Sequence, residues 1–504
     1  MKLKLVLIVL SIIAIAASYN SGIKDNSRPP NILYIMADDH TANAISAYNL
    51  RYAEVLKTPN IDRLAEEGAM LTNCFVTNSI CTPSRATILT GKYGHLNGVY
   101  TLWDDFDSEQ QNVAMLLQDA GYETAIIGKW HLHTKPNGFD FFSVLPGQGK
   151  YFNPVFREMD QEWVLNGKEG TTYEGYATDI IADKTITWLK NRDESKPFFL
   201  MSHHKAPHGL WEYAPRFEHL FDGVDIPEPE SLFEDKSHRS EGSREFGRDM
   251  LDLSKRMSEG NKGRGWPTGL LDVSGMNEEE IIRATYQKYL KDYLRVVAAI
   301  DENVGRVLDY IDEAGLAENT IVIYTSDQGM FLGEHQYYDK RWIFEEGIQM
   351  PFLIRYPGEI EAGTVCNDMV TNLDFAELFL DYAGVDIPAD MQGRSFRPNL
   401  EGKTPKDWRT SMYYRYWMQI EGSAVPAHYG IRTEDFKLIH FYGKGLQKKG
   451  TTVGWDTPDT WELYDLQKDP YEVKNEFENP EYSEVIKELK AELYELKEGY
   501  GDKE

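Results

Sequence analysis

The stretch Cys81-Thr82-Pro83-Ser84-Arg85-Ala86-Thr87-Ile88-Leu89-Thr90-Gly91 is the most informative part of this chain. Pro83 and Ser84 suit the first turn of a helix, because the N–H that proline lacks has no helical partner there in any case. A helix N-terminus favours negative charge, so this turn can hold an oxyanion beside residue 81. Arg85 adds a forked guanidinium that suits the same kind of anion. The alternative is a buried structural Cys81 at a strand-to-helix junction.

The length and charge of the chain limit its class. Its 504 residues suffice for one large α/β domain with a smaller one, or for three average domains. Hydrophobic residues make up 41% and aromatic residues 12%, which is typical of a globular core. The formal net charge of −28 argues against a nucleic-acid partner, which would require a basic face. An anionic substrate would therefore need basic side chains focused in one pocket.

The N-terminus is typical of a secretory signal peptide, which we predict at residues 1–17. Lys2 and Lys4 precede an apolar run over residues 5–15, and residues 14–16 form a small-residue cleavage pattern. The run is too short for a comfortable membrane span, and no cysteine follows it directly. We therefore expect a periplasmic or secreted protein without a membrane anchor.

Strand and helix patterns alternate through residues 28–400, which we predict to form one α/β domain. Apolar runs typical of strands occur at residues 31–37, 123–128, 197–202, 321–325 and 351–355, and helical patterns at residues 112–120, 277–314 and 374–383. The alternation predicts a mostly parallel sheet flanked by helices on both faces. Residues 226–269 are polar and Gly-rich, and we expect them to form a long surface loop.

The pattern changes near residue 400. Four short β-rich runs at residues 413–417, 430–432, 437–441 and 461–466 precede a Glu/Lys-rich helical pattern at residues 482–500. We therefore predict a smaller C-terminal antiparallel sheet with one helix, an α+β subdomain over residues 401–504.

Polar clusters follow the ends of four predicted strands. The first cluster is Asp38-Asp39, the second is Lys129 with His131, the third is His208 alone, and the fourth is Asp327-Gln328. The carboxyl ends of parallel strands meet at one edge of a sheet, so these side chains can converge there. Three carboxylates and an amide oxygen suit Ca²⁺ or Mg²⁺ better than zinc. Each acidic pair alone would more simply be a helix cap or a solvated turn.

The run from Cys81 to Arg85 resembles the maturation signature of type I sulfatases, in which a modifying enzyme oxidises the cysteine to formylglycine. Further blocks resemble the same family from Asn31 to about Asn475: residues 121–131, 204–208, 326–335, 463–466 and 469–470. The resemblance implies a sulfuric ester hydrolase with an alkaline-phosphatase-like α/β fold. Residues 28–400 would form its catalytic domain, and formylglycine made from Cys81 would supply the nucleophile.

The resemblance also implies roles for the polar clusters. Asp38, Asp39, Asp327, Gln328 and the modified Cys81 would bind Ca²⁺, or alternatively Mg²⁺. Many relatives carry Asn at the Gln328 position, but Gln offers the same carbonyl oxygen on a longer side chain. The residues that would hold the sulfate oxygens are Arg85, Lys129, His208 and Lys340.

Proton transfer and the remaining cysteines complete the assignment. His131 resembles the base that acts on the formylglycine hydrate, and either His208 or Lys340 would protonate the leaving alcohol. If Cys81 is modified, Cys74 and Cys366 remain as a candidate disulfide pair.

The expected partners are a sulfated polysaccharide or its oligosaccharides, and a formylglycine-generating or equivalent maturation enzyme. Residues 37–41 and 146–154 resemble bacterial polysaccharide sulfatases and also N-acetylglucosamine-6-sulfatases. We favour an algal glycan such as ulvan slightly over glycosaminoglycans. The other interpretations are a phosphonate monoester hydrolase or phosphodiesterase of the same superfamily, and a carbohydrate-binding protein that has lost catalysis.

Overall fold

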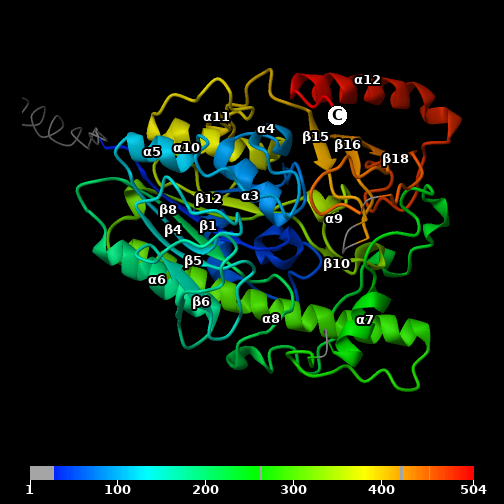
Figure 1. The fold of residues 1–504 in the computed structure, drawn as a ribbon, viewed down its shortest axis with the longest axis horizontal. Helices are drawn as coiled ribbons and strands as arrows, with labels where there is room; N and C mark the ends of the chain where they lie inside the picture. Colours follow the sequence, from blue (N-terminus) through cyan, green and yellow to red (C-terminus); the bar gives the residue numbers. More distant parts are fainter. Residues whose placement is uncertain (1–27, 261–263, 421–423, 453) are drawn as a thin grey trace, which may run out of the picture.

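The computed structural model describes residues 28–260, 264–420, 424–452 and 454–504, and the predicted signal peptide lies outside them. A ten-stranded sheet forms the centre of the molecule, with helices on both faces (Figure 1). Its strand order is β13-β2-β12-β9-β1-β8-β4-β5-β6-β7. The strand bounds are β1 Asn31–Ala37, β2 Ala69–Leu71, β4 Glu123–Lys129, β5 Phe141–Leu145, β6 Val155–Glu158, β7 Thr171–Thr172, β8 Phe198–His204, β9 Thr320–Ser326, β12 Phe352–Arg355 and β13 Thr364–Cys366.

The centre of the sheet is parallel, which confirms the predicted fold class. Strands β9, β1, β8, β4 and β5 pair with one another in parallel. Strand β12, which was expected from its apolar run, pairs antiparallel with β9 and β2. The sheet is therefore mixed towards its edges, and the ends of β1, β4, β8 and β9 meet at one edge of its parallel part.

Strand β1 explains why the sheet is covered on both faces. All seven of its residues are buried, and alternate side chains enter two separate hydrophobic cores. Successive residues of a strand point to opposite faces, so an entirely apolar strand requires a partner layer on each side. One layer contains α3 Cys81–Thr90, α5 Val113–Asp119 and α10 Phe375–Ala383, and the other contains α2 Pro59–Glu66, α6 Ala177–Asn191 and α8 Glu278–Glu313 (Figure 1).

The three predicted helices of this domain are present as α5, α8 and α10. Their starts follow local hydrogen bonding: Asn112 caps α5, and Asn277 with Glu280 forms a capping box at the start of α8. Within the described ranges, no helix combines the length and the apolar composition that crossing a membrane requires.

The C-terminal part of the chain forms the predicted small antiparallel sheet. It contains β15 Ser411–Tyr416, β16 His428–Thr433, β17 Phe436–Phe441 and β18 Thr460–Asp465, in chain order. Helix α12, Ser483–Gly499, packs against this sheet through Leu489 and Leu493 (Figure 1). The exact boundary near residue 400 stays a prediction.

The segment at residues 226–269 differs from the expected surface loop. It contains α7 Met250–Glu259, whose residues Met250, Leu253 and Met257 are buried in the same core as α8. Arg239 in the same segment is also buried. The apolar residues of this segment are few, but those of α7 lie on one face of the helix. The polar composition of the whole segment hides this pattern in the sequence.

The candidate disulfide between Cys74 and Cys366 is not formed. All three cysteines are free. Cys74 lies on β3 Cys74–Phe75, which pairs with β14 Val370–Thr371, whereas Cys366 ends β13 in the large sheet. The two residues therefore belong to different strand pairs, which counting cysteines in a sequence does not reveal.

A buried ionic cluster attaches the 226–269 segment to the loop that follows β9. Arg239 donates to both carboxylate oxygens of Glu234, at 2.9 and 3.0 Å. The Nδ1 atom of His335 lies 2.5 Å from the same carboxylate. Burial acts to lower the pKa of His335, but the hydrogen bond to Glu234 and the nearby carboxylate of Glu346 outweigh it and raise this pKa to about 9. His335 is therefore a buried imidazolium at neutral pH.

The raised pKa of His335 predicts a pH-dependent stability. Its stabilising contribution is complete below the ordinary pKa of 6.5 and is lost as the pH rises through about 9. The free energy of unfolding in urea should fall across this window by up to about 3 kcal/mol, and His335→Gln should flatten the fall. His219→Gln, at an exposed histidine, is the control and should leave the slope unchanged. An unaltered slope in His335→Gln would contradict the prediction.

Candidate active site

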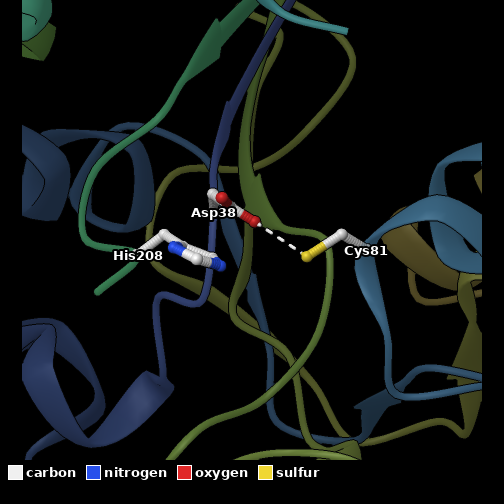
Figure 2. Close-up of side chains that lie close together, drawn as sticks. All are labelled: Asp38, Cys81 and His208. Atoms are coloured by element: carbon white, nitrogen blue, oxygen red, sulfur yellow. Dashed lines mark hydrogen bonds between the residues drawn. The ribbon is translucent and has the colours of Figure 1, made fainter. Parts of the chain in front are cut away.

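Cys81 lies at the first residue of α3, close to the edge where the central strands end. Its side chain is buried, and its Sγ atom lies 3.3 Å from Oδ1 of Asp38, the residue that follows β1. Figure 2 shows Asp38, Cys81 and His208 pointing towards one another. Burial and the charge of Asp38 raise the pKa of the Cys81 thiol. The unmodified residue is therefore a neutral thiol and a weak nucleophile.

Three buried carboxylates lie next to Cys81. Oxygens of Asp38, Asp39 and Asp327 are all within 4.8 Å of one another. Asp39 has a left-handed backbone with φ of 71°. This turn of the chain lets the neighbouring side chains of Asp38 and Asp39 take part in the same cluster. The backbone N–H of Asp39 donates to Oδ1 of Asp327 at 3.2 Å, which joins the ends of β1 and β9.

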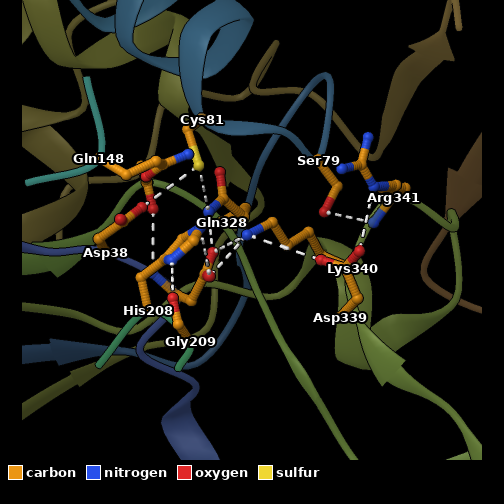
Figure 3. Close-up of polar contacts among 12 residues, drawn as sticks. Asp38, Ser79, Cys81, Gln148, His208, Gly209, Gln328, Asp339, Lys340 and Arg341 are labelled. Atoms are coloured by element: carbon orange, nitrogen blue, oxygen red, sulfur yellow. Dashed lines mark hydrogen bonds and ion pairs between the residues drawn. The ribbon is translucent and has the colours of Figure 1, made fainter. Parts of the chain in front are cut away.

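Buried cations neutralise these carboxylates in pairs. Lys129 forms an ion pair with Asp38, and the Nζ atom of Lys340 lies 2.5 and 2.7 Å from the two oxygens of Asp39 (Figure 3). Arg85 pairs with Asp327 at 2.9 Å. Three carboxylates are thus matched by three cationic side chains, as buried charges require.

The carboxylates differ in their protonation. Burial acts to raise the pKa of Asp38, but Lys129 and other cations hold it well below its usual range. Burial and the charge of Asp38 raise the pKa of Asp327 to about 7, against the opposing effect of Arg85. The neighbouring carboxylates therefore still favour the protonated form of Asp327, despite its pairing with Arg85. A divalent cation between them would favour the ionised form of all three.

Gln328 completes an oxygen-rich ligand set. Its Nε2 atom donates to Asp39 and lies 3.6 Å from the Sγ atom of Cys81, while its Oε1 atom is buried without a partner. A half-turn rotation of the Gln328 amide group would exchange the positions of its oxygen and nitrogen, and the oxygen would then point towards the carboxylates. Three carboxylates and one buried unpaired amide oxygen fit a hard cation such as Ca²⁺ or Mg²⁺.

Two histidines lie on either side of this cluster. The Nε2 atom of His208 is 3.9 Å from Asp39, and its Nδ1 atom lies 2.6 Å from the carbonyl of Gly209. His131 has a left-handed backbone with φ of 56°, and its Nδ1 atom is buried without a partner. Burial and the neighbouring Lys129 hold the pKa of His131 well below its usual range. Its imidazole is therefore neutral, and its unpaired nitrogen is available to a hydrogen-bond partner.

The structure brings most of the sequence-predicted residues together and adds others, whereas His131 lines a neighbouring cavity. A cavity of about 440 Å³ opens above Cys81, Asp39, His208 and Lys340. Gln148, which accepts a hydrogen bond from Lys129 at 2.5 Å, also lines it (Figure 3). Gln148 belongs to the 146–154 segment, where family resemblance was the only signal. Additional lining residues missed by the sequence analysis are Trp211, Arg248, Arg256, Tyr338 and Arg341.

The C-terminal sheet supports one wall of the cavity. Tyr414 on β15 donates a hydrogen bond to the carbonyl of Arg341 at 2.5 Å, and Arg341 donates to the hydroxyl of Tyr416 at 3.1 Å. Arg341 directly follows Lys340 in the chain. The small sheet therefore helps to fix the position of Lys340.

Comparisons with known proteins show the family of the chain. A family model described as Sulfatase matches residues 30–385, and one described as N-sulphoglucosamine sulphohydrolase, C-terminal, matches residues 333–499. An N-acetylglucosamine-6-O-sulfatase of Bacteroides thetaiotaomicron is 42% identical, over 98% of this chain and 91% of its own. An ulvan-active sulfatase of Formosa agariphila is 26% identical, over 94% of this chain and 81% of its own.

A solved structure in complex with its substrate, D-glucosamine-2-N,6-O-disulfate, is also similar. It superposes with a TM-score of 0.84 and 41% identity, and the match covers 95% of this chain and 99% of that chain. The fold and the site define an alkaline-phosphatase-like hydrolase. The chain belongs to the sulfatase family and hydrolyses sulfate esters. Members of this family generally use formylglycine and a divalent metal, and the acidic cluster provides a place for the metal.

The acidic cluster predicts cation-dependent stability. After chelator treatment, added Ca²⁺ should raise the Tm, because a ligand that binds only the native state stabilises it by about 2.7 kcal/mol at a hundred times Kd. Asp327→Asn should remove most of this rise in a thermal unfolding assay, because it removes one carboxylate ligand. Asp309→Asn, at an exposed aspartate, should retain it. An equal rise in Asp327→Asn and the parent protein would place the cation elsewhere.

Proposed function

We propose that this protein is an exported sulfatase that removes the 6-O-sulfate from glucosamine units of glycosaminoglycans. The observation that carries the proposal is the buried cluster around Cys81, together with 42% identity to an N-acetylglucosamine-6-O-sulfatase over 98% of the chain. The similar structure holding D-glucosamine-2-N,6-O-disulfate supports the same sugar. Because the ulvan-active relative is only 26% identical, the comparisons favour this alternative over the algal glycan preferred from the sequence.

The proposed cation ligands are Asp38, Asp39, Asp327, Gln328 and residue 81. The Sγ atom of Cys81 stands in for an oxygen of formylglycine, into which a maturation enzyme would convert this residue. When loaded, the cation supplies positive charge beside the sulfate, and formylglycine supplies a hydrated aldehyde whose hydroxyl is the nucleophile. We propose Ca²⁺ as the ion, because all the protein ligands are hard oxygens.

The pairing of charges in the structure supports roles for the basic residues. When the carboxylates bind a divalent cation, their ion pairs with Lys129 and Lys340 weaken. Their ammonium groups can then contact the oxygens of the sulfate ester, together with Arg85 and His208. Positive charge fixed around the ester offsets the negative charge that otherwise repels a nucleophile.

Three residues are in position for proton transfer. His131 is neutral and has an unpaired buried nitrogen, so it can accept the proton from residue 81 that accompanies sulfate release. The leaving alcohol of the sugar requires a proton donor, and His208 and Lys340 both line the cavity. Burial acts to lower the pKa of Lys340, but its ion pair with Asp39 helps to raise this pKa and keeps the side chain charged.

The proposal predicts a specific substrate profile. The matured protein should release sulfate from N-acetylglucosamine 6-sulfate faster than from sulfated ulvan oligosaccharides or from an aryl phosphonate. Cys81→Ala should lower kcat by a factor of about 10³ or more, because it removes the nucleophile. Cys366→Ala is the matched control and should retain activity. Sulfate should be measured chromatographically, and mass spectrometry of the peptide containing residue 81 should detect formylglycine.

Each alternative activity has its own signature in this assay. Preferred turnover of the aryl phosphonate would identify a phosphonate monoester hydrolase instead, and preferred turnover of ulvan would restore the algal interpretation. Binding of sulfated sugars without any sulfate release by the matured protein would favour a carbohydrate-binding protein.

The identity of the proton donor can be tested through the leaving group. Loss of a general acid typically costs about 10²–10⁴ in rate, and the cost is smaller when the leaving group needs no proton. The two variants to compare are His208→Ala and Lys340→Ala. The variant that lacks the proton donor should lose far more activity on N-acetylglucosamine 6-sulfate than on nitrophenyl sulfate. Equal losses on both substrates in both variants would show that neither side chain protonates the alcohol.

A further inference from the structure

A second, larger cavity adjoins the Cys81 cavity. Its volume is about 810 Å³, within the range of pockets that bind small molecules. Leu102 and Gln148 line both cavities, so the two spaces are neighbours. Gln148 accepts a hydrogen bond from Lys129 at 2.5 Å, which fixes the shared wall to the catalytic cluster. A molecule bound at Cys81 can therefore extend towards the second cavity.

The lining of this second cavity is basic, although the chain is strongly acidic. None of the described lining residues is Asp or Glu, whereas four are Lys or Arg. Lys150 and Lys168 are exposed and, within the described part of the chain, form no ion pair. Lys449 pairs with Asp105 at 3.3 Å. In a chain with a net charge of −28, such a concentration of positive charge selects anionic ligands.

The fourth basic residue, Arg157 on β6, is buried without a counter-ion. Its side chain is 4% exposed, and its guanidinium stacks 3.8 Å from the ring centroid of Trp163. Glu169 contributes only a distant electrostatic effect, and no carboxylate of the described residues forms an ion pair with Arg157. A buried arginine is normally paired. The indole nitrogen of Trp163 is buried without an acceptor. Among the described residues the Arg157 guanidinium forms no ion pair, so it borders the cavity as an unpaired donor.

Aromatic side chains supply the apolar part of the lining. Trp103, Trp130 and Trp163 all line the cavity, and Trp103 is 45% exposed. Flat aromatic rings offer a surface for the C–H faces of a sugar, while the unpaired donors suit its anionic substituents. Together these features match an anionic sugar better than an apolar ligand or a simple inorganic ion.

We propose that this cavity is a second carbohydrate site, which binds an adjacent sugar unit that carries a sulfate or carboxylate. This second-site proposal rests on the proposed function, because the adjacent unit belongs to the same oligosaccharide whose sulfate ester reaches residue 81. The Arg157 guanidinium, held against the Trp163 ring, contacts the anionic substituent, and Lys150 and Lys168 attract it. The protein therefore prefers anionic oligosaccharides to single sulfated sugars.

The test compares a single sulfated sugar with an oligosaccharide that carries further sugar units. One is N-acetylglucosamine 6-sulfate, and the other is a tetrasaccharide in which 6-sulfated glucosamine adjoins a uronic acid. Arg157→Gln should lower the ratio of kcat/KM for the tetrasaccharide to that for the monosaccharide about tenfold, mainly through KM, because it removes a charged hydrogen bond. The double variant Lys150→Gln/Lys168→Gln changes only exposed residues and should lower the ratio in the same direction.

Two controls separate the second site from general effects. Lys196→Gln removes an exposed charge elsewhere on the surface and should leave the ratio unchanged. Raising the salt concentration should reduce the preference of the parent protein for the tetrasaccharide, because screening weakens exposed charges. An unchanged ratio in both Arg157→Gln and the double lysine variant would overturn the proposal.

Binding distinguishes failure of this inference from failure of the proposed function. Full-length Cys81→Ala protein should bind the tetrasaccharide in calorimetry, and adding Arg157→Gln should weaken the binding about tenfold. If the parent protein hydrolyses neither sugar, the proposed function fails, and this titration still decides the second site. Equal affinity with and without Arg157 would rule the site out.

Discussion

The structure depends on the pairing of three buried carboxylates with three buried cations beside residue 81. Asp38, Asp39 and Asp327 lie too close together to be ionised without compensation, and Lys129, Lys340 and Arg85 supply it. A divalent cation bound by the carboxylates would leave the basic side chains available for a sulfate ester. The proposed cation and substrate sites would then be built from one set of charges.

The fold brings these charges together from distant parts of the sequence. Strands β1, β4 and β9 end at the same edge of the parallel sheet, and the N-terminus of α3 faces them (Figure 1). The small C-terminal sheet adds hydrogen bonds to Arg341, next to Lys340. The cavity lined by Arg157 adjoins the same edge through Gln148, so catalysis and recognition of a longer sugar chain would share one wall.

Much of this arrangement was predictable from the sequence, and the limits have physical causes. Continuous apolar runs indicated the central strands, and polar residues directly after them indicated the cluster, because strand ends converge whatever the intervening loops do. The helix α7 was missed because its few apolar residues lie in a polar segment. Arg157 gave no signal, since an unpaired buried arginine can be recognised only once its neighbours in space are known. The choice of sugar was also beyond residue patterns, and the comparisons shifted it from ulvan towards glucosamine.

The most direct test of the central claim is a crystal structure of the matured protein with Ca²⁺ and a sulfated glucosamine in a catalytically inactive variant such as His131→Ala. We predict one cation bound by Asp38, Asp39, Asp327, Gln328 and residue 81. Lys129 and Lys340 should contact the sulfate oxygens in place of their carboxylate partners. A structure in which the cation lies elsewhere, or in which both lysines keep their carboxylate pairs while the sulfate binds apart from residue 81, would contradict it.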